Sequence, residues 1–208
     1  MNPTAMPRLI LGVLGGLASG KSTVARLILS FAPGKLFDAD AVAKESLEAC
    51  VRDGRLQAAL GPKCVGKDGL PDRKAIAAIV FRDPRALRAL ERLTHPLVTA
   101  RIDDAVEDHR SGRGDSLLVL DVPLLIEVGL ERRCDALWFV DVPDALRYAR
   151  AEKRLGLSRD DVERRDAAQA PLDRKRARAD FVIDNSGAPE ALTAQVVAGL
   201  RALGCRIE

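Results

Sequence analysis

One stretch near the N-terminus constrains the fold of this chain more than any other, because it fits the pattern G-x-x-x-x-G-K-[ST]. It consists of Gly15, Gly16, Leu17, Ala18, Ser19, Gly20, Lys21 and Ser22. The apolar run 9–14 before it predicts a buried strand, and the spacing over 23–29 predicts a helix. Glycines let the backbone N–H groups curl around phosphate oxygens, and the helix N-terminus adds positive potential. We expect Lys21 to reach the β- and γ-phosphates of a nucleoside triphosphate and the Ser22 hydroxyl to hold Mg²⁺. The alternative, a chance match in a glycine-rich turn, is less frequent in this strand–helix context.

Composition limits the partners of the chain. Its 208 residues carry a formal net charge of +3 and include one Trp, one Tyr and five Phe. A mild basic excess suits an anionic small substrate as well as nucleic acid. Few rings are available for stacking on bases, so we expect no nucleic acid as a main partner.

The sequence also predicts a location. No apolar run approaches the roughly 18 residues that a membrane-spanning helix needs, and residues 1–7 lack the features of a secretory signal. Four cysteines lie far apart, at Cys50, Cys64, Cys134 and Cys205. We therefore expect reduced thiols in a soluble, cytoplasmic protein without a membrane partner. Residues 1–7 are expected to form a loose tail, and Met6 is an alternative start.

Two aspartates, Asp38 and Asp40, follow a short predicted strand at 36–37. In open α/β sheets, ligands bind beyond the carboxyl ends of the strands, which is also where the phosphate loop lies. Carboxylates there would position a metal or accept a proton from an attacking hydroxyl. Either aspartate can instead cap the helix predicted over 41–47, and both interpretations remain open.

Residues 45–114 have a helical pattern that differs from the sheet segments. Helices are predicted at 56–60, at 73–81 after an Asp72 cap, from near 84 to 93, and from 97 to about 110, with Thr94-His95-Pro96 as an interruption. An insertion of this size between two strands usually serves the second substrate. His95 is no metal candidate, because the other histidine is His109 and no cysteine is close in sequence to either. It is either a structural residue or a substrate contact.

Three later apolar runs predict strands at 117–127, 136–142 and 181–185. The first is nearly continuous, as in a parallel strand that is buried on both faces. It contains Asp121, a candidate for holding Mg²⁺ through water. Five short strands with helices between them predict a doubly wound parallel sheet.

Arginines gather between the last two predicted strands. Arg147, Arg150 and Arg154 share one helical face, residues 156–158 break that helix, and a basic run follows at 174–178. Any single arginine here is most simply a solvated surface residue. As a group beside a triphosphate site they predict a mobile lid that closes over the phosphates.

A series of motifs occurs in one order along nearly the whole chain, from about Leu9 to the C-terminal helix. They are the phosphate loop, Phe37-Asp38-Ala39-Asp40, Asp68-Gly69 followed by Arg73, Val80-Phe81, His95-Pro96, the D-V-P-L-L-I-E run at 121–127, Gln169, and Ala179-Asp180 leading to Ile183-Asp184-Asn185. This series resembles the dephospho-coenzyme A kinase family. The resemblance implies ATP-dependent phosphorylation of the 3′-hydroxyl of dephospho-coenzyme A, the last step of coenzyme A biosynthesis, with Mg²⁺ as cofactor.

The resemblance and the phosphate loop together imply individual roles. The expected catalytic residues are Asp40, as general base or hydroxyl-positioner, Lys21 and Arg150. The expected ATP-binding residues are Gly16, Leu17, Ala18, Ser19, Gly20, Lys21, Ser22, Thr23, Arg150 and Asn185. The expected substrate-binding residues are Asp40, Lys44, Arg73, His95, Pro123, Leu124 and Glu127, and the expected metal-binding residues are Ser22 and Asp121.

The chain departs from the family pattern at three positions. Leu14 and Ala18 stand where the family commonly has Thr and Gly, and Lys44 stands where Arg is frequent. Ala18 keeps its N–H, so we expect the phosphate cradle to survive if this residue avoids a positive φ. Lys44 would lose the bidentate phosphate contact that an arginine makes.

The predicted fold class is α/β, the P-loop nucleoside-triphosphate hydrolase fold. It has a five-stranded parallel sheet with helices on both faces, a helical substrate-binding insertion and a lid. We expect one kinase domain, with its core at 8–40, 115–145 and 179–208, a coenzyme-binding insertion at about 41–114, and the lid at about 146–178. The alternatives are another nucleoside monophosphate or small-molecule P-loop kinase and, from a different class, a nucleotide-switch binding protein.

Overall fold

The computed structural model describes residues 8–112 and 116–207. The tail and the alternative start expected in residues 1–7 lie outside these residues. Contacts divide the chain into two compact units, Met1–Phe37 with Val106–Glu208, and Asp38–Ala105. Each unit has its own apolar core. In the described part of the chain, no helix is both long enough and apolar enough to cross a membrane.

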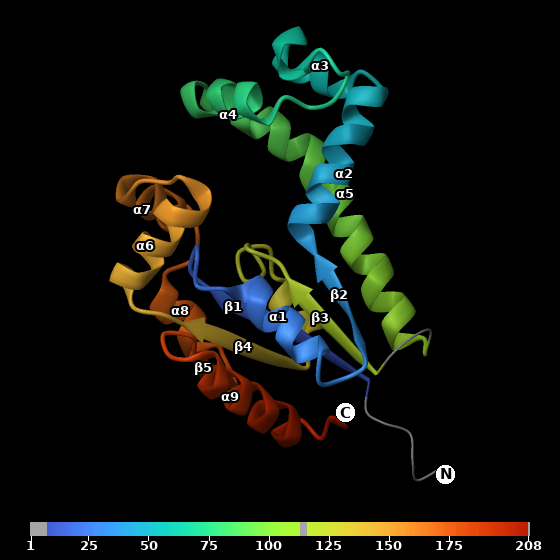
Figure 1. The fold of residues 1–208 in the computed structure, drawn as a ribbon. Helices are drawn as coiled ribbons and strands as arrows, with labels where there is room; N and C mark the ends of the chain where they lie inside the picture. The colour runs from blue at the N-terminus through green and yellow to red at the C-terminus, as the bar shows by residue number, and fades with distance from the viewer. Residues whose placement is uncertain (1–7, 113–115, 208) are drawn as a thin grey trace. The chain divides into compact units, whose positions relative to one another are not determined.

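The first unit is built on a five-stranded parallel sheet in the order β2-β3-β1-β4-β5 (Figure 1). Its strands are β1 (Leu9–Gly15), β2 (Gly34–Asp38), β3 (Leu117–Asp121), β4 (Ala136–Asp141) and β5 (Phe181–Asp184). In the register of the central strands, Leu11 of β1 pairs with Val119 of β3 and with Ala136 of β4. The residues of β1, β3 and β4 are nearly all buried, because helices cover both faces of a parallel sheet.

Two helices pack on one face of this sheet, α1 (Lys21–Leu29) and α9 (Pro189–Ala202) (Figure 1). Their apolar stripes, which include Ile28 and Val196, join Val13 and Trp138 in a single core cluster. A Cβ on Gly199 would lie 2.6 Å from the Trp138 ring, so glycine lets α9 approach β4 closely. This packing fixes the start of α1, where the phosphate loop ends.

The second unit is helical. It contains α2 (Ala39–Arg52), α3 (Arg55–Leu60), the 3₁₀ turn η1 (Pro62–Cys64), α4 (Arg73–Arg82) and most of α5 (Pro84–Arg110). Its core is formed by Cys50, Val51, Leu56, Cys64 and Ile76, with Leu90, Leu93 and Leu97 of α5 packed against them. The Asp72 carboxylate accepts from the N–H groups of Lys74 and Ala75, which confirms the predicted cap of α4.

The prediction of a helix break at Thr94-His95-Pro96 was wrong, since α5 runs without interruption from Pro84 to Arg110. A proline inside a helix leaves the carbonyl four residues earlier, here that of Arg92, without its helical donor. Both Arg92 and Pro96 are exposed, so water can reach that carbonyl. The apolar residues of α5 on the opposite side hold the helix to the core.

The predicted strand over 117–127 was too long. β3 ends at Asp121, and turns follow up to the 3₁₀ helix η2 (Leu130–Arg133). Pro123 has no N–H to give to a neighbouring strand, and Leu125, Val128 and Gly129 instead donate to carbonyls three or four residues earlier. The apolar residues of this turn segment, Leu125 and Ile126, are buried as in a strand, which explains why the pattern suggested one.

Three helices join β4 to β5: α6 (Asp144–Leu155), α7 (Arg159–Ala167) and α8 (Leu172–Ala177). The predicted break between the first two is confirmed, because Gly156 takes a left-handed conformation and Ser158 forms a capping box with Asp161. Whether this segment moves as a lid stays a prediction.

Candidate functional site

The phosphate loop connects β1 to α1. Gly20 is the N-cap of α1 and has a φ of 91°, in the left-handed region that glycine tolerates. A Cβ at this position would also lie only 2.4 Å from the Asn185 side-chain nitrogen. An α-helix leaves its first N–H groups without partners inside the helix, so the curled loop and the start of α1 form a site for an anion.

Ala18 has a φ of 60°, so the condition under which we expect the phosphate cradle to survive, that this residue avoids a positive φ, is not met. For a residue with a Cβ, this conformation costs roughly 1–2 kcal/mol relative to the right-handed one. The Ala18 N–H is retained, and the loop keeps its donors. Surrounding contacts must therefore hold the loop in a conformation that alanine alone does not favour.

Lys21 lies folded over the loop. Its Nζ donates to Gly15 O at 3.1 Å and to Gly16 O at 3.0 Å. The ammonium group therefore already lies at the loop where phosphates would bind.

Ser22 and Asp121 meet beside the loop. The Ser22 hydroxyl, in the first turn of α1, donates to Asp121 Oδ2 at 2.5 Å, and Asp121 is 6% exposed at the end of β3. Hydroxyl and carboxylate oxygens suit Mg²⁺, which is usually held by one or two protein groups together with substrate phosphates and water. No group of three or more His, Cys, Asp or Glu side chains that could hold a metal occurs within residues 8–112 and 116–207. The donor set thus fits a magnesium ion that is bound together with a nucleotide.

Asn185 and Arg150 are tied to the other side of the loop. The Asn185 side chain donates to Ser19 O at 2.8 Å, and Arg150 donates to Asn185 O at 2.8 Å. Two residues that the sequence assigned to ATP binding are therefore brought together at the loop, although 35 positions separate them.

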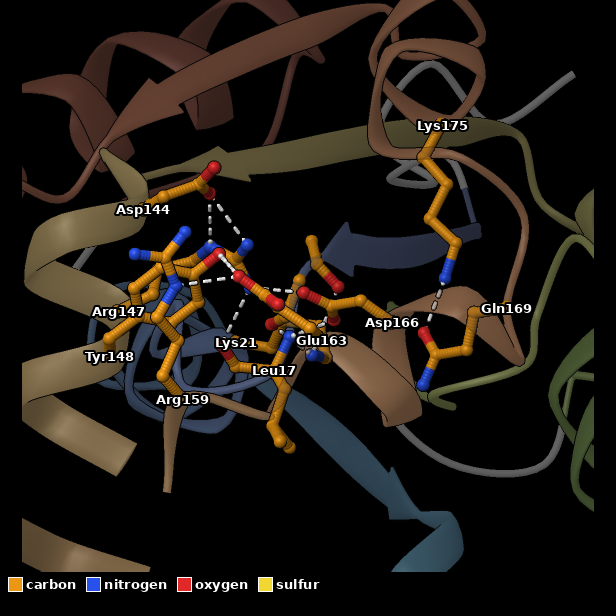
Figure 2. Close-up of polar contacts among 12 residues, drawn as sticks. Leu17, Lys21, Asp144, Arg147, Tyr148, Arg159, Glu163, Asp166, Gln169 and Lys175 are labelled. Carbon is orange, nitrogen blue, oxygen red and sulfur yellow. Dashed lines mark hydrogen bonds and ion pairs between the residues drawn. The ribbon is translucent and has the colours of Figure 1, made fainter. Parts of the chain in front are cut away.

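Arg147 and Lys175 are not solvated, contrary to the simplest interpretation of the arginine-rich segment. Arg147 is 3% exposed and pairs with Asp144 and Asp166 (Figure 2). Lys175 is 1% exposed and pairs with Glu127 at 3.0 Å. Burial alone would lower the pKa of Arg147, but its hydrogen bonds to both carboxylates raise that pKa above its usual value. Both cations are thus anchors within the first unit.

Glu127 was predicted to bind substrate, and here its Oε1 accepts from Lys175 Nζ and, at 2.6 Å, from Ala170 N. Burial would raise the pKa of Glu127, but these hydrogen bonds outweigh it and lower the pKa below its ordinary value. Lys175 also donates to Gln169 at 2.7 Å (Figure 2) and to Pro123 O at 3.4 Å. The turn that holds Pro123 and Leu124 is therefore tied to α8.

A cavity of about 380 Å³ adjoins the loop. It lies between Gly16, the carboxyl end of β4 and α8, and its charged lining comprises Asp141, Asp144, Arg147, Asp173 and Arg176. Arg176 and Asp141 form an ion pair across it.

The other predicted substrate residues belong to the second unit. Asp38 is the N-cap of α2 and accepts from Ala41 N at 3.0 Å, which settles its capping role, whereas Asp40 is exposed in the first turn. Lys44 and Arg73 line one cavity of about 170 Å³, together with Glu48 and Asp68. His95 lines a different cavity of about 380 Å³, beside Arg88 and Arg92.

Sequence reasoning missed Asp144 and Asp166 as partners of Arg147, and it missed the burial of Lys175. Each lies in a strongly charged segment, where a solvated face is the ordinary expectation. In the sequence, Gln169 was only one of the motifs that carry the family resemblance. The structure shows that its side chain accepts from Lys175. No local signal pairs residues that are 19 or 48 positions apart.

A parallel sheet in the order 2-3-1-4-5, with a phosphate loop after its central strand and a serine–aspartate pair beside it, defines a P-loop kinase. The family model described as dephospho-CoA kinase matches residues 9–190. The dephospho-CoA kinase of Deinococcus radiodurans is 45% identical over 193 residues, which cover 93% of this chain and 91% of that one. The dephospho-CoA kinase of Symbiobacterium thermophilum is 43% identical over 201 residues, covering 93% and 80%. The crystal structure of a Thermus thermophilus protein superposes with a TM-score of 0.76 at 35% identity, covering 95% of this chain and 98% of that one.

The chain belongs to the dephospho-CoA kinase family. Its activity is dephospho-CoA kinase activity, the final step of coenzyme A biosynthesis. The family is ATP-dependent.

Proposed function

We propose that the chain transfers the γ-phosphoryl group of Mg·ATP to the 3′-hydroxyl of dephospho-coenzyme A at the phosphate loop. A bond forms between the γ-phosphorus and the 3′-oxygen, the bond to the β–γ bridging oxygen breaks, and the hydroxyl proton leaves. The observation that carries the proposal is the contact of Ser22 with Asp121 beside the loop, in a chain of this family.

The nucleotide side is assigned to the residues around the loop. Backbone N–H groups of the loop and the first turn of α1 cradle the phosphates, apart from those that already donate within the protein, such as Leu17 N to Asp166. Lys21 moves from the loop carbonyls to the β- and γ-phosphates. Arg150 and Asn185, already joined to each other and to Ser19, bind the nucleotide from the other side. Charge that spreads over the transferring phosphoryl group is stabilised by these fixed donors.

Ser22 and Asp121 would hold Mg²⁺, Ser22 through its hydroxyl and Asp121 through water. When bound, the ion neutralises charge on the β- and γ-phosphates. Asp121 is nearly buried at the end of a central strand, which fixes its carboxylate relative to Ser22.

Asp40 is assigned to the acceptor, where it orients the 3′-hydroxyl and accepts its proton. Phosphoryl transfer has a loose transition state, so the proton can leave late and orientation matters as much as basicity. Lys44 and Arg73, which line one cavity, are suited to the anionic groups of the coenzyme. His95, which lines another cavity, is a further contact. Pro123 and Leu124 supply apolar contacts. Glu127, bound by Lys175 and Ala170, contributes by fixing this turn rather than as a free carboxylate.

The test is ATP consumption with and without dephospho-coenzyme A, with product identified by mass spectrometry. Adenosine monophosphate, shikimate and gluconate serve as comparison acceptors. Among these acceptors, we expect only dephospho-coenzyme A to stimulate ATP consumption. The product should be heavier than dephospho-coenzyme A by one phosphoryl group. Turnover with another acceptor would favour a different small-molecule kinase. Slow hydrolysis that no acceptor stimulates would favour a nucleotide switch.

A further inference from the structure

The backbone of Leu17, in the middle of the phosphate loop, is held at both its N–H and its carbonyl by side chains from outside the loop (Figure 2). Its N–H donates to Asp166 Oδ1 at 3.3 Å, and its carbonyl accepts from Arg147 Nη1 at 3.1 Å. The same Arg147 nitrogen donates to Asp166 Oδ2 at 2.8 Å. The two side chains and the Leu17 backbone thus form a closed ring of hydrogen bonds.

Arg147 is itself fixed in place. Its Nε and Nη2 donate to Asp144 Oδ1 at 3.2 and 2.7 Å, and it is almost fully buried. A Cβ on Gly16 would lie 2.5 Å from its Nη1 atom, so glycine permits the close approach. With two carboxylates on one guanidinium, Arg147 can move little without breaking several charged contacts.

This ring determines where the neighbouring N–H groups point. In a planar trans peptide the C=O and N–H point in opposite directions. Arg147 holds Leu17 O, so the Ala18 N–H points away from Arg147. On the preceding peptide, Gly16 O accepts from Lys21 and from Ser19 N at 3.3 Å, while the Leu17 N–H points to Asp166. The Gly16–Leu17 and Leu17–Ala18 peptide planes are therefore each held by a side chain from outside the loop. The φ of 60° at Ala18 sets the angle between the Leu17–Ala18 plane and the following peptide.

We propose that Arg147 and Asp166 are positioning residues of the phosphate loop. They hold the Leu17 peptide so that Ala18 keeps its unfavourable positive φ and its N–H faces the phosphates of ATP. Asp166 lies in α7, beyond the break at Gly156, so a helix of the predicted lid contributes to holding the phosphate loop. The inference rests on the proposed function, since it requires that this loop binds the phosphates of ATP.

The test is ATP binding by calorimetry without acceptor, together with steady-state kinetics. Arg147→Gln should raise the Kd and KM for ATP about tenfold, the loss expected for one charge-assisted hydrogen bond. The kcat and the KM for dephospho-coenzyme A should change less than about twofold, because the lost interaction binds ATP equally well in the ground state and in the transition state. Asp166→Ala should act in the same direction, by about threefold. Lys153→Gln removes an exposed charge from α6, the helix that contains Arg147, and is the matched control. It should change neither the ATP affinity nor the kinetic constants.

Ala18→Gly separates positioning from a general loss of stability. Glycine adopts a positive φ without strain, so Ala18→Gly combined with Arg147→Gln should restore ATP affinity to within about threefold of the unsubstituted enzyme. A merely structural role for Arg147 would not be rescued at a distance in this way. If Arg147→Gln does not fold, Arg147→Lys, which keeps a charged donor, should fold and show a smaller rise in Kd.

Three results would overturn the proposal. One is unchanged ATP affinity in folded Arg147→Gln, and another is a fall in kcat with KM unchanged. The third is tighter ATP binding by Asp166→Ala, which would show that this carboxylate competes with phosphate. If the unsubstituted protein itself fails to bind ATP, the proposed function fails instead, so the two failures are distinguishable.

Discussion

Lys175 offers the sharpest test of how the first unit is held together. Its ammonium group is 1% exposed and has three acceptors, on Glu127, Gln169 and Pro123. They join the turn after β3 to the segment that leads into α8. Lys175→Met shortens the unbranched side chain by only one atom and removes the charge, leaving Glu127 without its cation.

The magnitude follows from the burial of each partner. Removing one partner of a buried ion pair costs about 3–5 kcal/mol. Glu127 keeps 19% exposure and its bond from Ala170, so we expect about 2–4 kcal/mol here. For a chain of this size each kcal/mol lowers the melting temperature by about 2–4 °C, so Lys175→Met should melt about 5–15 °C lower.

The assay is thermal and urea unfolding of Lys175→Met, of Glu127→Gln and of the double variant. Removing both charges should recover about 1–2 kcal/mol of the summed losses, since no unpaired carboxylate remains. Lys153→Met, at an exposed position of α6, is the matched control and should stay within about 0.5 kcal/mol. Lys175→Met melting within about 2 °C of the unsubstituted protein, with strictly additive losses, would refute the reasoning.

Three further outcomes test the site. Lys21→Ala should lower kcat/KM by roughly 10²–10³, because a preorganised charge on the developing oxygens is worth about 3–4 kcal/mol, and its loss of two loop contacts should lower the melting temperature by only a few degrees; near-normal turnover would contradict the loop assignment. Asp40→Asn should lower kcat by roughly 10²–10⁴ with Mg·ATP affinity unchanged in calorimetry; weakened nucleotide binding would make Asp40 a metal residue instead. Glu127→Gln should destabilise most at neutral pH. Since the pKa of Glu127 is lowered by folding, its stabilisation is present above the unfolded pKa of about 4.3 and is lost as the pH falls through the folded pKa. The difference in urea midpoint between Glu127→Gln and the unsubstituted protein should therefore become smaller below about pH 4.5. A difference that does not change with pH would contradict this.

The parts of the fold that sequence predicts are those that local rules decide. The G-x-x-x-x-G-K-[ST] loop, the Asp72 cap and the Gly156 break each depend on residues a few positions apart, and all three are confirmed. The predicted ends of helices and strands were wrong where tertiary packing produces the same burial pattern as a strand or overrides a local signal. Leu125 and Ile126 are buried in a turn, and the packing of α5 carries the helix past Pro96.

The site was predicted where its residues lie at the carboxyl ends of strands, and it was missed where charged side chains of helices meet. Ser22 and Asp121 could be placed together because both follow the carboxyl ends of strands in a parallel sheet. Arg147 and Asp166 could not, because hydrophobic periodicity treats each charged residue as exposed. A guanidinium can be buried when carboxylates from two helices, here Asp144 of α6 and Asp166 of α7, converge on it. Only the tertiary structure reveals that convergence.

Ala18 shows how such a convergence alters what a local rule predicts. Its positive φ costs roughly 1–2 kcal/mol in the native state, whereas a glycine there would lose about 0.5–1 kcal/mol more backbone entropy on folding. Ala18→Gly alone should therefore stabilise by up to about 1 kcal/mol and raise the melting temperature by up to about 4 °C. Its ATP affinity should stay unchanged in calorimetry, because Arg147 and Asp166 already hold the loop and glycine keeps the same N–H. A lower melting temperature would show that the φ of 60° costs alanine less than the backbone entropy that glycine loses. A gain in affinity would show that the loop is not held before the nucleotide arrives.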